Sequence, residues 1–437
     1  MTTLRKRLAA AAVVLGMTSS MASASVALGH DLHQGSVDIS VGTDITQQIF
    51  WSDTYSDLRT EHYLTYTPNS QVLPTIAYGS TILSKATLTS MAQSLESQGK
   101  RVVGGINGDY YALATGSPVG VVITNGVIQS APSTDSSASG SWYWGIGFTS
   151  DGTAFIGQPK IAIQAYWGGV GHNITGGLNK VRSSTGGYTL LNSSFSSTTQ
   201  NTSAGVDVVL APVTDQVGQT VTRADGVTLT ISDQPVVNGR MTFVVEQVLE
   251  SSRSISIPAG KYVLTVNNQC GPDWTDPLKA LQVGETVDID FTSRDSAHDW
   301  SQAVEAIGAP SRLVNNGAVD YSSFRGDSNA NTRRARTAIG IKADGSVIFY
   351  TLDGGKSGYS VGCTLEQTAM RLIELGCVQA IALDGGGSTT IGATYPDDSA
   401  MGVVNQPSDG QQRANSTAIF LTTDLKPTGV LDHYYVT

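Results

Sequence analysis

The residues with the clearest chemical potential are two aspartates that follow apolar stretches late in the chain. Asp353 follows residues 346–352 and precedes two glycines, and Asp384 follows residues 378–383. A glycine turn comes directly after Asp384: Gly385, Gly386, Gly387 and Ser388. Successive glycines let backbone amides approach phosphate oxygens, and a neighbouring carboxylate can serve as a base or nucleophile. Asp-Gly is also a common turn, so for Asp353 a structural role is an equal alternative.

Two arginines and an earlier polar segment extend this set. Arg336 enters a predicted hairpin ahead of Asp353, and Arg413 precedes the last predicted strand, residues 417–421. A guanidinium group can pair with a phosphate or a carboxylate. Another predicted strand, residues 102–106, ends in three polar or small residues: Asn107, Gly108 and Asp109. Each group of candidate residues is therefore predicted at or beside a strand end.

A strand–helix–strand unit is predicted to position the two aspartates. Thr364 and Gln367 form a capping box at the start of the helix, and Gly376 ends it. The strands on either side should be parallel, so that their carboxyl ends lie at one edge of the sheet. Asp353 and Asp384 would then face one crevice if the two strands are neighbours.

Five segments, taken in order, resemble the phosphodiester glycosidase family. They are Gly105-Ile-Asn-Gly-Asp-Tyr-Tyr111, Arg336-Thr-Ala-Ile-Gly340, Gly362-Cys-Thr-Leu-Glu366, Leu383-Asp-Gly-Gly-Gly-Ser-Thr389 and Val404-Asn-Gln-Pro-Ser408 with Arg413. The resemblance covers most of residues 60–422 and thins out in the middle. It implies an enzyme that hydrolyses a sugar-1-phosphodiester, similar to N-acetylglucosamine-1-phosphodiester, between the anomeric carbon and oxygen. The substrate would be a glycan or glycosyl phosphate.

The resemblance also implies roles for the candidate residues. Asp384 would be the base or nucleophile, and Asp109 would hold sugar hydroxyls or act as a second carboxylate. The phosphate would be held by Arg336, Arg413, Ser388 and the amides of Gly385, Gly386 and Gly387. Asn107 would hold sugar hydroxyls, and Gly108, Thr337 and Asp353 are counted as substrate-binding. Departure of a phosphate needs positive charge more than a strong general acid.

No cofactor is certain from the sequence. The carboxylates of Asp109, Asp353 and Asp384 are oxygen ligands of the kind that Ca²⁺ or Mg²⁺ takes, although no calcium-loop spacing is present. The three cysteines lack a C-x-x-C pair. Cys363 and Cys377 flank the predicted helix too far apart to form a disulfide with each other, and a bridge from Cys270 stays open.

Composition narrows the class of protein. The 437 residues include 26 basic and 36 acidic side chains, a net charge of −10, and 48 glycines. Such a balance argues against nucleic acid as a partner, because phosphate binding along a backbone needs clustered lysine and arginine. Low charge with many glycines indicates a β-rich, secreted protein. An N-terminal basic cluster, an apolar run and Ala22-Ser23-Ala24 predict a signal peptide over residues 1–24. No later stretch is apolar enough for stable membrane insertion.

Internal similarity indicates a pseudo-twofold core. Hairpins are predicted at Asn125-Gly126 and Asp151-Gly152, and a similar pair at Asn316-Gly317 and Asp344-Gly345. We expect an α+β, β-rich fold of mixed sheets with a C-terminal βαβ unit. Its predicted parts are a first half over residues 25–157, an inserted β-rich region without evident chemistry over 158–290, a second half over 291–424 and a tail over 425–437.

Two other functions fit parts of the sequence. A secreted or cell-wall glycan-binding module without catalysis would present surface aromatic residues, for which Trp142, Tyr143 and Trp144 are candidates. The turn after Asp384 also resembles the phosphate turn of sugar kinases and exopolyphosphatases of the actin-like superfamily. No matching first phosphate loop lies near the N-terminus, so this alternative is weaker.

Overall fold

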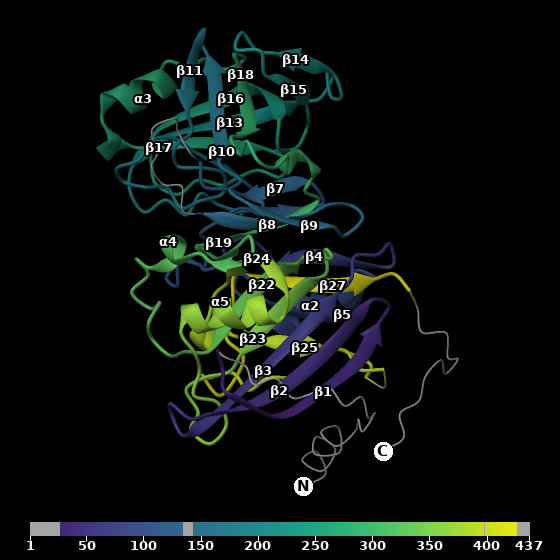
Figure 1. Ribbon diagram of the computed structural model, residues 1–437. Coiled ribbons are helices and arrows are strands. Elements are labelled where there is room, and N and C mark those ends of the chain that lie inside the picture. The colour runs from purple at the N-terminus through teal and green to yellow at the C-terminus, as the bar shows by residue number, and fades with distance from the viewer. Residues whose placement is uncertain (1–26, 134–142, 397, 426–437) are drawn as a thin grey trace.

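The computed structural model describes residues 27–133, 143–396 and 398–425. The predicted signal peptide, Trp142 and nearly all of the predicted tail lie outside the described residues. Two groups of strands are stacked in Figure 1, with β10–β18 above and the remaining sheets below. The fold is α+β and β-rich, as predicted. Within the described residues, no helix is long and apolar enough to cross a membrane.

The largest lower sheet has eight strands and contains the strand before Asp384. In sheet order these are β1 (His30–Ser40), β2 (Thr43–Ser52), β3 (Asp57–Tyr66), β23 (Val347–Leu352), β22 (Arg336–Lys342), β24 (Cys377–Ala382), β20 (Ser311–Asn315) and β21 (Ala318–Val319). Neighbouring strands are antiparallel throughout. β23 and β24 are thus parallel to one another, but β22 lies between them. The predicted parallel direction of the two strands is therefore confirmed, whereas the condition that they be neighbours is not met, because β22 lies between them.

Helix α5 (Leu365–Glu374) connects these two parallel strands. Thr364 accepts the backbone amide of Gln367, and the Gln367 side chain bonds back to the Thr364 amide, so the predicted capping box is present. Leu365, Ala369 and Leu372 form the buried face. That face packs in a core cluster with Ala338, Ile348 and other residues of the eight-stranded sheet.

A second lower sheet has five strands and repeats part of the first. Its order is β7 (Val127–Ser130), β6 (Val122–Thr124), β19 (Glu305–Ala309), β8 (Trp144–Phe148) and β9 (Ala154–Gly157). Two hairpins thus flank β19, just as β20–β21 and β22–β23 flank β24. Both central strands are antiparallel to the inner strand of each hairpin. The predicted pseudo-twofold repeat is therefore confirmed.

The repeat also explains where the middle of the chain belongs. α5 connects the second hairpin to the central strand in one copy, whereas residues 158–304 make that connection in the other. Asn and Gly at both Asn-Gly turns have positive φ, 51° and 77° at Asn125-Gly126 and 50° and 74° at Asn316-Gly317. These angles suit a two-residue hairpin turn, which explains the Asn-Gly sequence.

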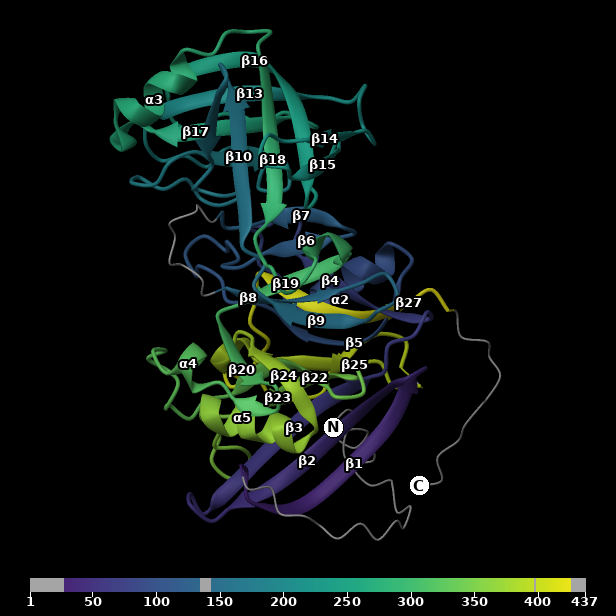
Figure 2. The same ribbon diagram turned by 45° about the horizontal axis from the view of Figure 1, so that its top comes forward.

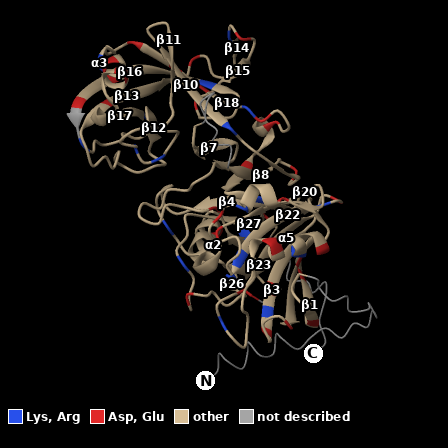
Figure 3. Ribbon diagram, turned by 60° about the vertical axis from the view of Figure 1, so that its left-hand side comes forward, with Lys and Arg blue, Asp and Glu red and all other residues tan. Residues whose placement is uncertain are grey.

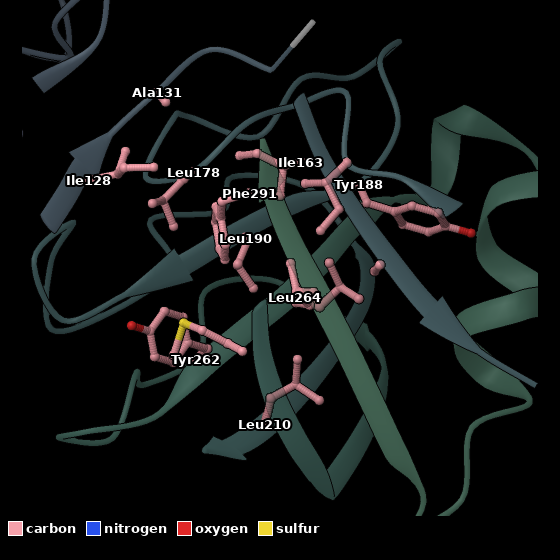
Figure 4. Packing of buried hydrophobic residues seen from close by; sticks show 14 of the residues in the cluster. Ile128, Ala131, Ile163, Leu178, Tyr188, Leu190, Leu210, Tyr262, Leu264 and Phe291 are labelled. Atoms are coloured by element: carbon pink, nitrogen blue, oxygen red, sulfur yellow. The ribbon is translucent and has the colours of Figure 1, made fainter. Parts of the chain in front are cut away.

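The upper sheet has nine strands and comes from residues 161–293. Its main order is β11 (Val170–Asn173), β10 (Ile161–Trp167), β18 (Thr286–Ser293), β16 (Gly239–Ser252), β13 (Gly205–Val213), β17 (Tyr262–Asn267) and β12 (Thr189–Asn192), with β14 (Thr220–Thr222) and β15 (Thr228–Ile231) beside β16. Side chains such as Leu210, Leu264 and Phe291 fill its core (Figure 4). β10 begins and β18 ends near β7 and β6 (Figure 2). Its sheet thus begins and ends close to the predicted boundaries of the inserted region.

The fourth sheet supplies the Asn107 segment. Its strands are β26 (Gly402–Val403), β25 (Ile391–Ala393), β5 (Arg101–Asn107), β27 (Thr417–Thr423) and β4 (Val72–Tyr78). α2 (Leu88–Ser97) packs on it with Met91 and Leu95 buried, as its periodicity predicts. The other short helices are α3 (Pro272–Lys279), α4 (Tyr321–Phe324), η1 (Asn268–Cys270), η2 (Trp300–Gln302) and η3 (Gly386–Ser388). Charged residues of both signs are thinly spread over the ribbon (Figure 3).

Candidate active site

The Asp384 turn is held where the ends of β24 and β5 meet. The backbone amide of Asp384 donates to the Gly108 carbonyl at 3.0 Å, and Asn107 Nδ2 donates to the Asp384 carbonyl at 2.7 Å. These two bonds join segments that are 277 residues apart. The tertiary structure therefore brings the two polar strand ends of the sequence into one place.

Asn107, Gly108 and Thr337 form the support beneath this turn. Asn107 is 1% exposed, and its Oδ1 accepts the Thr337 hydroxyl at 2.9 Å and the Thr390 amide at 3.0 Å. A Cβ on Gly108 would overlap the side chains of Ile307 and Thr417, so only glycine fits there. The geometry gives these residues contacts that position Asp384, whereas their predicted contact with substrate stays a prediction.

The Asp384 carboxylate is half-buried and carries one strong local partner. Ser388 Oγ donates to its Oδ2 at 2.6 Å, and the Gly385 amide also hydrogen-bonds to the carboxylate. Burial raises the pKa of Asp384 to about 6, although these bonds and the Arg413 charge oppose the rise. The group is therefore largely ionised near neutral pH and still basic enough to accept a proton.

Arg413 provides positive charge at the same turn. Its Nη1 lies 3.5 Å from Ser388 Oγ, while Nε and Nη2 bond to Asp409 Oδ2 at 3.0 and 2.7 Å. The Arg413 side chain is 36% exposed, so the guanidinium can meet a ligand from solvent. Gly387 lies directly beneath this ion pair, because a Cβ there would overlap Arg413 Nη2 and both Asp409 carboxylate oxygens.

Two of the three glycine amides are already used within the protein. Gly385 bonds to the Asp384 carboxylate, and the Gly386 amide donates to the Ala335 carbonyl at 2.7 Å. Gly386 has a φ of +62°, which glycine adopts without strain. The turn is therefore fixed by hydrogen bonds within the protein. Of the three glycines predicted to bind phosphate, Gly387 is the one that lies next to the Arg413 guanidinium.

Arg336 lies deeper than Arg413. It is 3% exposed, and it donates to the carbonyls of Cys363, Asn329 and Thr332 at 3.0, 2.8 and 2.5 Å through Nε and Nη2. Its Nη1 forms no hydrogen bond with a described residue. Most of this guanidinium therefore anchors the 329–332 loop, and one nitrogen is left for a ligand.

Asp109 is buried near Asp384 and is 1% exposed. Its Oδ1 accepts the Tyr110 amide and its Oδ2 accepts the Gly120 amide, both at 2.7 Å. Burial raises the pKa of Asp109 to about 7, and the negative charge of Asp384 adds to this rise. The two predicted carboxylates are thus brought close enough to influence each other electrostatically.

Asp353 shares the edge of the sheet but makes a different set of contacts. Its Oδ1 accepts Asn405 Nδ2 at 2.7 Å, and its Oδ2 accepts the Gln406 amide at 2.9 Å and the Tyr359 hydroxyl at 2.8 Å. These bonds fix the loop around Asn405, and the predicted contact of Asp353 with substrate stays a prediction. Among the described residues, no three His, Cys, Asp or Glu side chains gather as a metal site requires.

Sequence reasoning did not single out several residues at this site. Tyr110, Tyr111 and Asp409 surround Asp384 and Arg413, and the Asp409-x-x-x-Arg413 spacing was an available signal. Lys180 of the inserted region lies beside Asp109, with no motif around it. The expectation that this region holds no chemistry overlooked it, because a tertiary contact alone brings Lys180 there.

Other predicted features differ in how close they lie to the site. Of the predicted aromatic candidates, Tyr143 is near the Asp109 charge, and Trp144 packs under the Arg312 guanidinium, 4.0 Å from its ring centre. Cys270, Cys363 and Cys377 are free thiols. A cavity of about 830 Å³ lies between β4, α2 and the end of β27, and none of the predicted site residues lines it.

Comparison with solved structures supports the fold. A hypothetical protein from Synechocystis matches with a TM-score of 0.67 at 16% identity, over 90% of this chain and 64% of that one. An exported protein, as its name describes it, from Burkholderia pseudomallei matches with a TM-score of 0.61 at 16% identity, over 86% of this chain and 76% of that one. The present chain thus spans less than two thirds of the first structure.

Two sequence comparisons concern shorter stretches. The prophage-derived uncharacterised protein YomE of Bacillus subtilis is 36% identical over 86 residues, which are 19% of this chain and 12% of that protein. Residues 232–422 match the family model described as phosphodiester glycosidase, and this range includes Arg336, Asp384 and Arg413. The resemblance predicted from the motifs is therefore confirmed over residues 232–422, which are similar to the phosphodiester glycosidase family.

Proposed function

We propose that this protein is a secreted glycosidase that hydrolyses a sugar-1-phosphodiester, similar to N-acetylglucosamine-1-phosphodiester, on an extracellular or cell-wall glycan. The observation that carries the proposal is the pairing of Asp384 with Arg413 across the Ser388 hydroxyl, at 2.6 and 3.5 Å. One side of the turn offers a base and the other a cation. The family match over residues 232–422 supports the same chemistry.

The reaction would break the bond between the anomeric carbon and the phosphate oxygen. That oxygen leaves with the bonding electrons as part of a phosphomonoester, whose negative charge Arg413 and the free Nη1 of Arg336 stabilise. Asp384 either accepts a proton from the attacking water or attacks the anomeric carbon itself, followed by hydrolysis. In both routes water supplies the new hydroxyl group on the sugar.

Asp109 serves as the second carboxylate in this proposal. Its raised pKa lets it exchange a proton near neutral pH, and its negative form would support positive charge developing on the sugar ring. Because the departing phosphate is a good leaving group, little protonation of the leaving oxygen is required. The two aspartates therefore share the work at the anomeric carbon, and the arginines act on the phosphate.

Replacement of Asp384 tests the proposal. The variant D384N keeps the Ser388 contact but lacks the basic carboxylate. We expect its turnover of a model sugar-1-phosphodiester to fall by more than about 1,000-fold. Sugar and phosphomonoester release would be measured together with the thermal unfolding midpoint. Asp344→Asn, in an exposed hairpin turn, is the matched control. Near-normal turnover by D384N contradicts the assignment, and glycan binding without turnover by the native protein favours the binding module instead.

A further inference from the structure

The side chain of Lys180, in the inserted region, lies beside Asp109 of the candidate active site. Between β11 and β12 the chain passes along β7, where Leu178 and Ala131 exchange backbone hydrogen bonds. Asn179 is fully buried, has a φ of +53° and bonds to the Gln129 carbonyl at 2.7 Å and to Asn192 at 2.8 Å. The left-handed backbone of Asn179 directs the Lys180 side chain away from the nine-stranded sheet.

Lys180 ends at three successive backbone carbonyls in the segment between β5 and β6. Its Nζ lies 2.5 Å from the oxygen of Pro118, 3.3 Å from that of Val119 and 3.0 Å from that of Gly120. An ammonium group has three N–H donors and no acceptor. Three carbonyls around one nitrogen therefore match the ammonium form of Lys180 donor for donor. Burial lowers the pKa of Lys180 to about 7, and the nearby Asp109 carboxylate opposes this fall.

The segment 118–120, whose carbonyls contact Lys180, also hydrogen-bonds to the Asp109 carboxylate. The Gly120 amide donates to Asp109 Oδ2 at 2.7 Å, and the Val119 amide donates to the Tyr110 carbonyl at 2.9 Å. The packing around Gly120 is tight, because a Cβ on this residue would lie 2.8 Å from Asp109 Oδ2 and 2.6 Å from the Gly308 Cα. A shift of the 118–120 turn would thus move the carboxylate.

We propose that Lys180 is a positioning residue, through which the inserted β-rich region fixes the Asp109 carboxylate of the active site. The inference rests on the proposed function, since Asp109 is given a catalytic part there. It assigns a task to a region in which the sequence shows no chemistry. Loss of the lysine should disturb the chemical step and leave the Arg413 side of the substrate site unchanged.

The test compares Lys180→Met with Lys261→Met, a partly exposed lysine of the same region that pairs with Glu246. We expect K180M to lower kcat by about 100-fold with KM changed less than about threefold, because a misplacement near 1 Å costs about that factor. The groups that act electrostatically on or with Asp109 are Lys180, Asp384, Tyr110 and Tyr143. Without the lysine charge, the pKa of Asp109 rises, so the pH limb that depends on it moves upward.

Amide hydrogen exchange at residues 119–121 provides a readout that does not need turnover. K180M should exchange the Gly120 amide faster than the native protein, whereas K261M should not. If K180M does not fold, Lys180→Arg replaces it, since a planar guanidinium cannot meet three converging carbonyls, and kcat should fall at least about tenfold. Unchanged exchange or unchanged kcat in the folded variant overturns the inference. An inactive native protein refutes the proposed function, and the exchange result still decides the role of Lys180 in holding the turn.

Discussion

The sharpest prediction concerns Gly387, the residue beneath the Arg413–Asp409 pair. A methyl group at this position would overlap Arg413 Nη2 and both Asp409 carboxylate oxygens. Non-bonded heavy atoms settle at roughly 3.5 to 4 Å, so Gly387→Ala must displace the guanidinium by about 1 Å or more. The backbone φ of Gly387 lies outside the left-handed region, so alanine adds no backbone strain.

The displaced groups are the ends of flexible, exposed side chains, so the change should scarcely affect folding. The Arg413 and Asp409 side chains are 36% and 42% exposed, and such pairs contribute about 0.2–1 kcal/mol to stability. Activity should respond much more, because misplacing a catalytic cation by about 1 Å costs about 100-fold in rate. This factor corresponds to about 2.7 kcal/mol of transition-state stabilisation.

The assay is kcat/KM for a sugar-1-phosphodiester beside the unfolding midpoint in urea. Gly402→Ala is the first control, because a Cβ there meets no atom within 4 Å. Gly386→Ala is the second, since its φ of +62° imposes strain without any contact. Our reasoning is refuted if G387A is as active as G402A while both are folded, since Arg413 would then have no part in the reaction.

Three further predictions follow from buried charges. Burial raises the pKa of Asp384 to about 6 and that of Asp109 to about 7, so the native state binds more protons than the unfolded state between about pH 4 and 7. Stability should therefore fall as pH rises through this window, and urea midpoints of D109N should show a flatter pH dependence; an equal slope would contradict this. Arg371→Met should destabilise the fold by about 3–5 kcal/mol, because it leaves the Glu61 carboxylate buried without its cation, and a urea midpoint near the native value would disprove it. Treatment with EDTA should leave turnover unchanged, because the Asp353 oxygens already bond to Asn405, Gln406 and Tyr359; activity restored by Ca²⁺ or Mg²⁺ after chelation would show the opposite.

Much of the local structure was predictable because it depends on neighbouring residues. The Asn-Gly turns, the Thr364 capping box and the apolar face of α2 all follow from local φ preferences, capping bonds and periodicity. The repeated hairpins were visible for the same reason. The insertion of β22 between β23 and β24 was not, since strand order depends on contacts distant in sequence.

By itself, the sequence determined the residue types that bear chemistry, the glycine turn after Asp384 and the resemblance to the phosphodiester glycosidase family, whose model matches residues 232–422. Only the tertiary structure decided which of those residues meet. It joined the Asn107 and Asp384 segments, placed Asp353 in contact with the loop around Asn405 and brought Lys180 close to Asp109. The physical reason is that turns and caps are specified within a few residues, whereas burial, pKa shifts and ion pairing depend on which distant strands pack together.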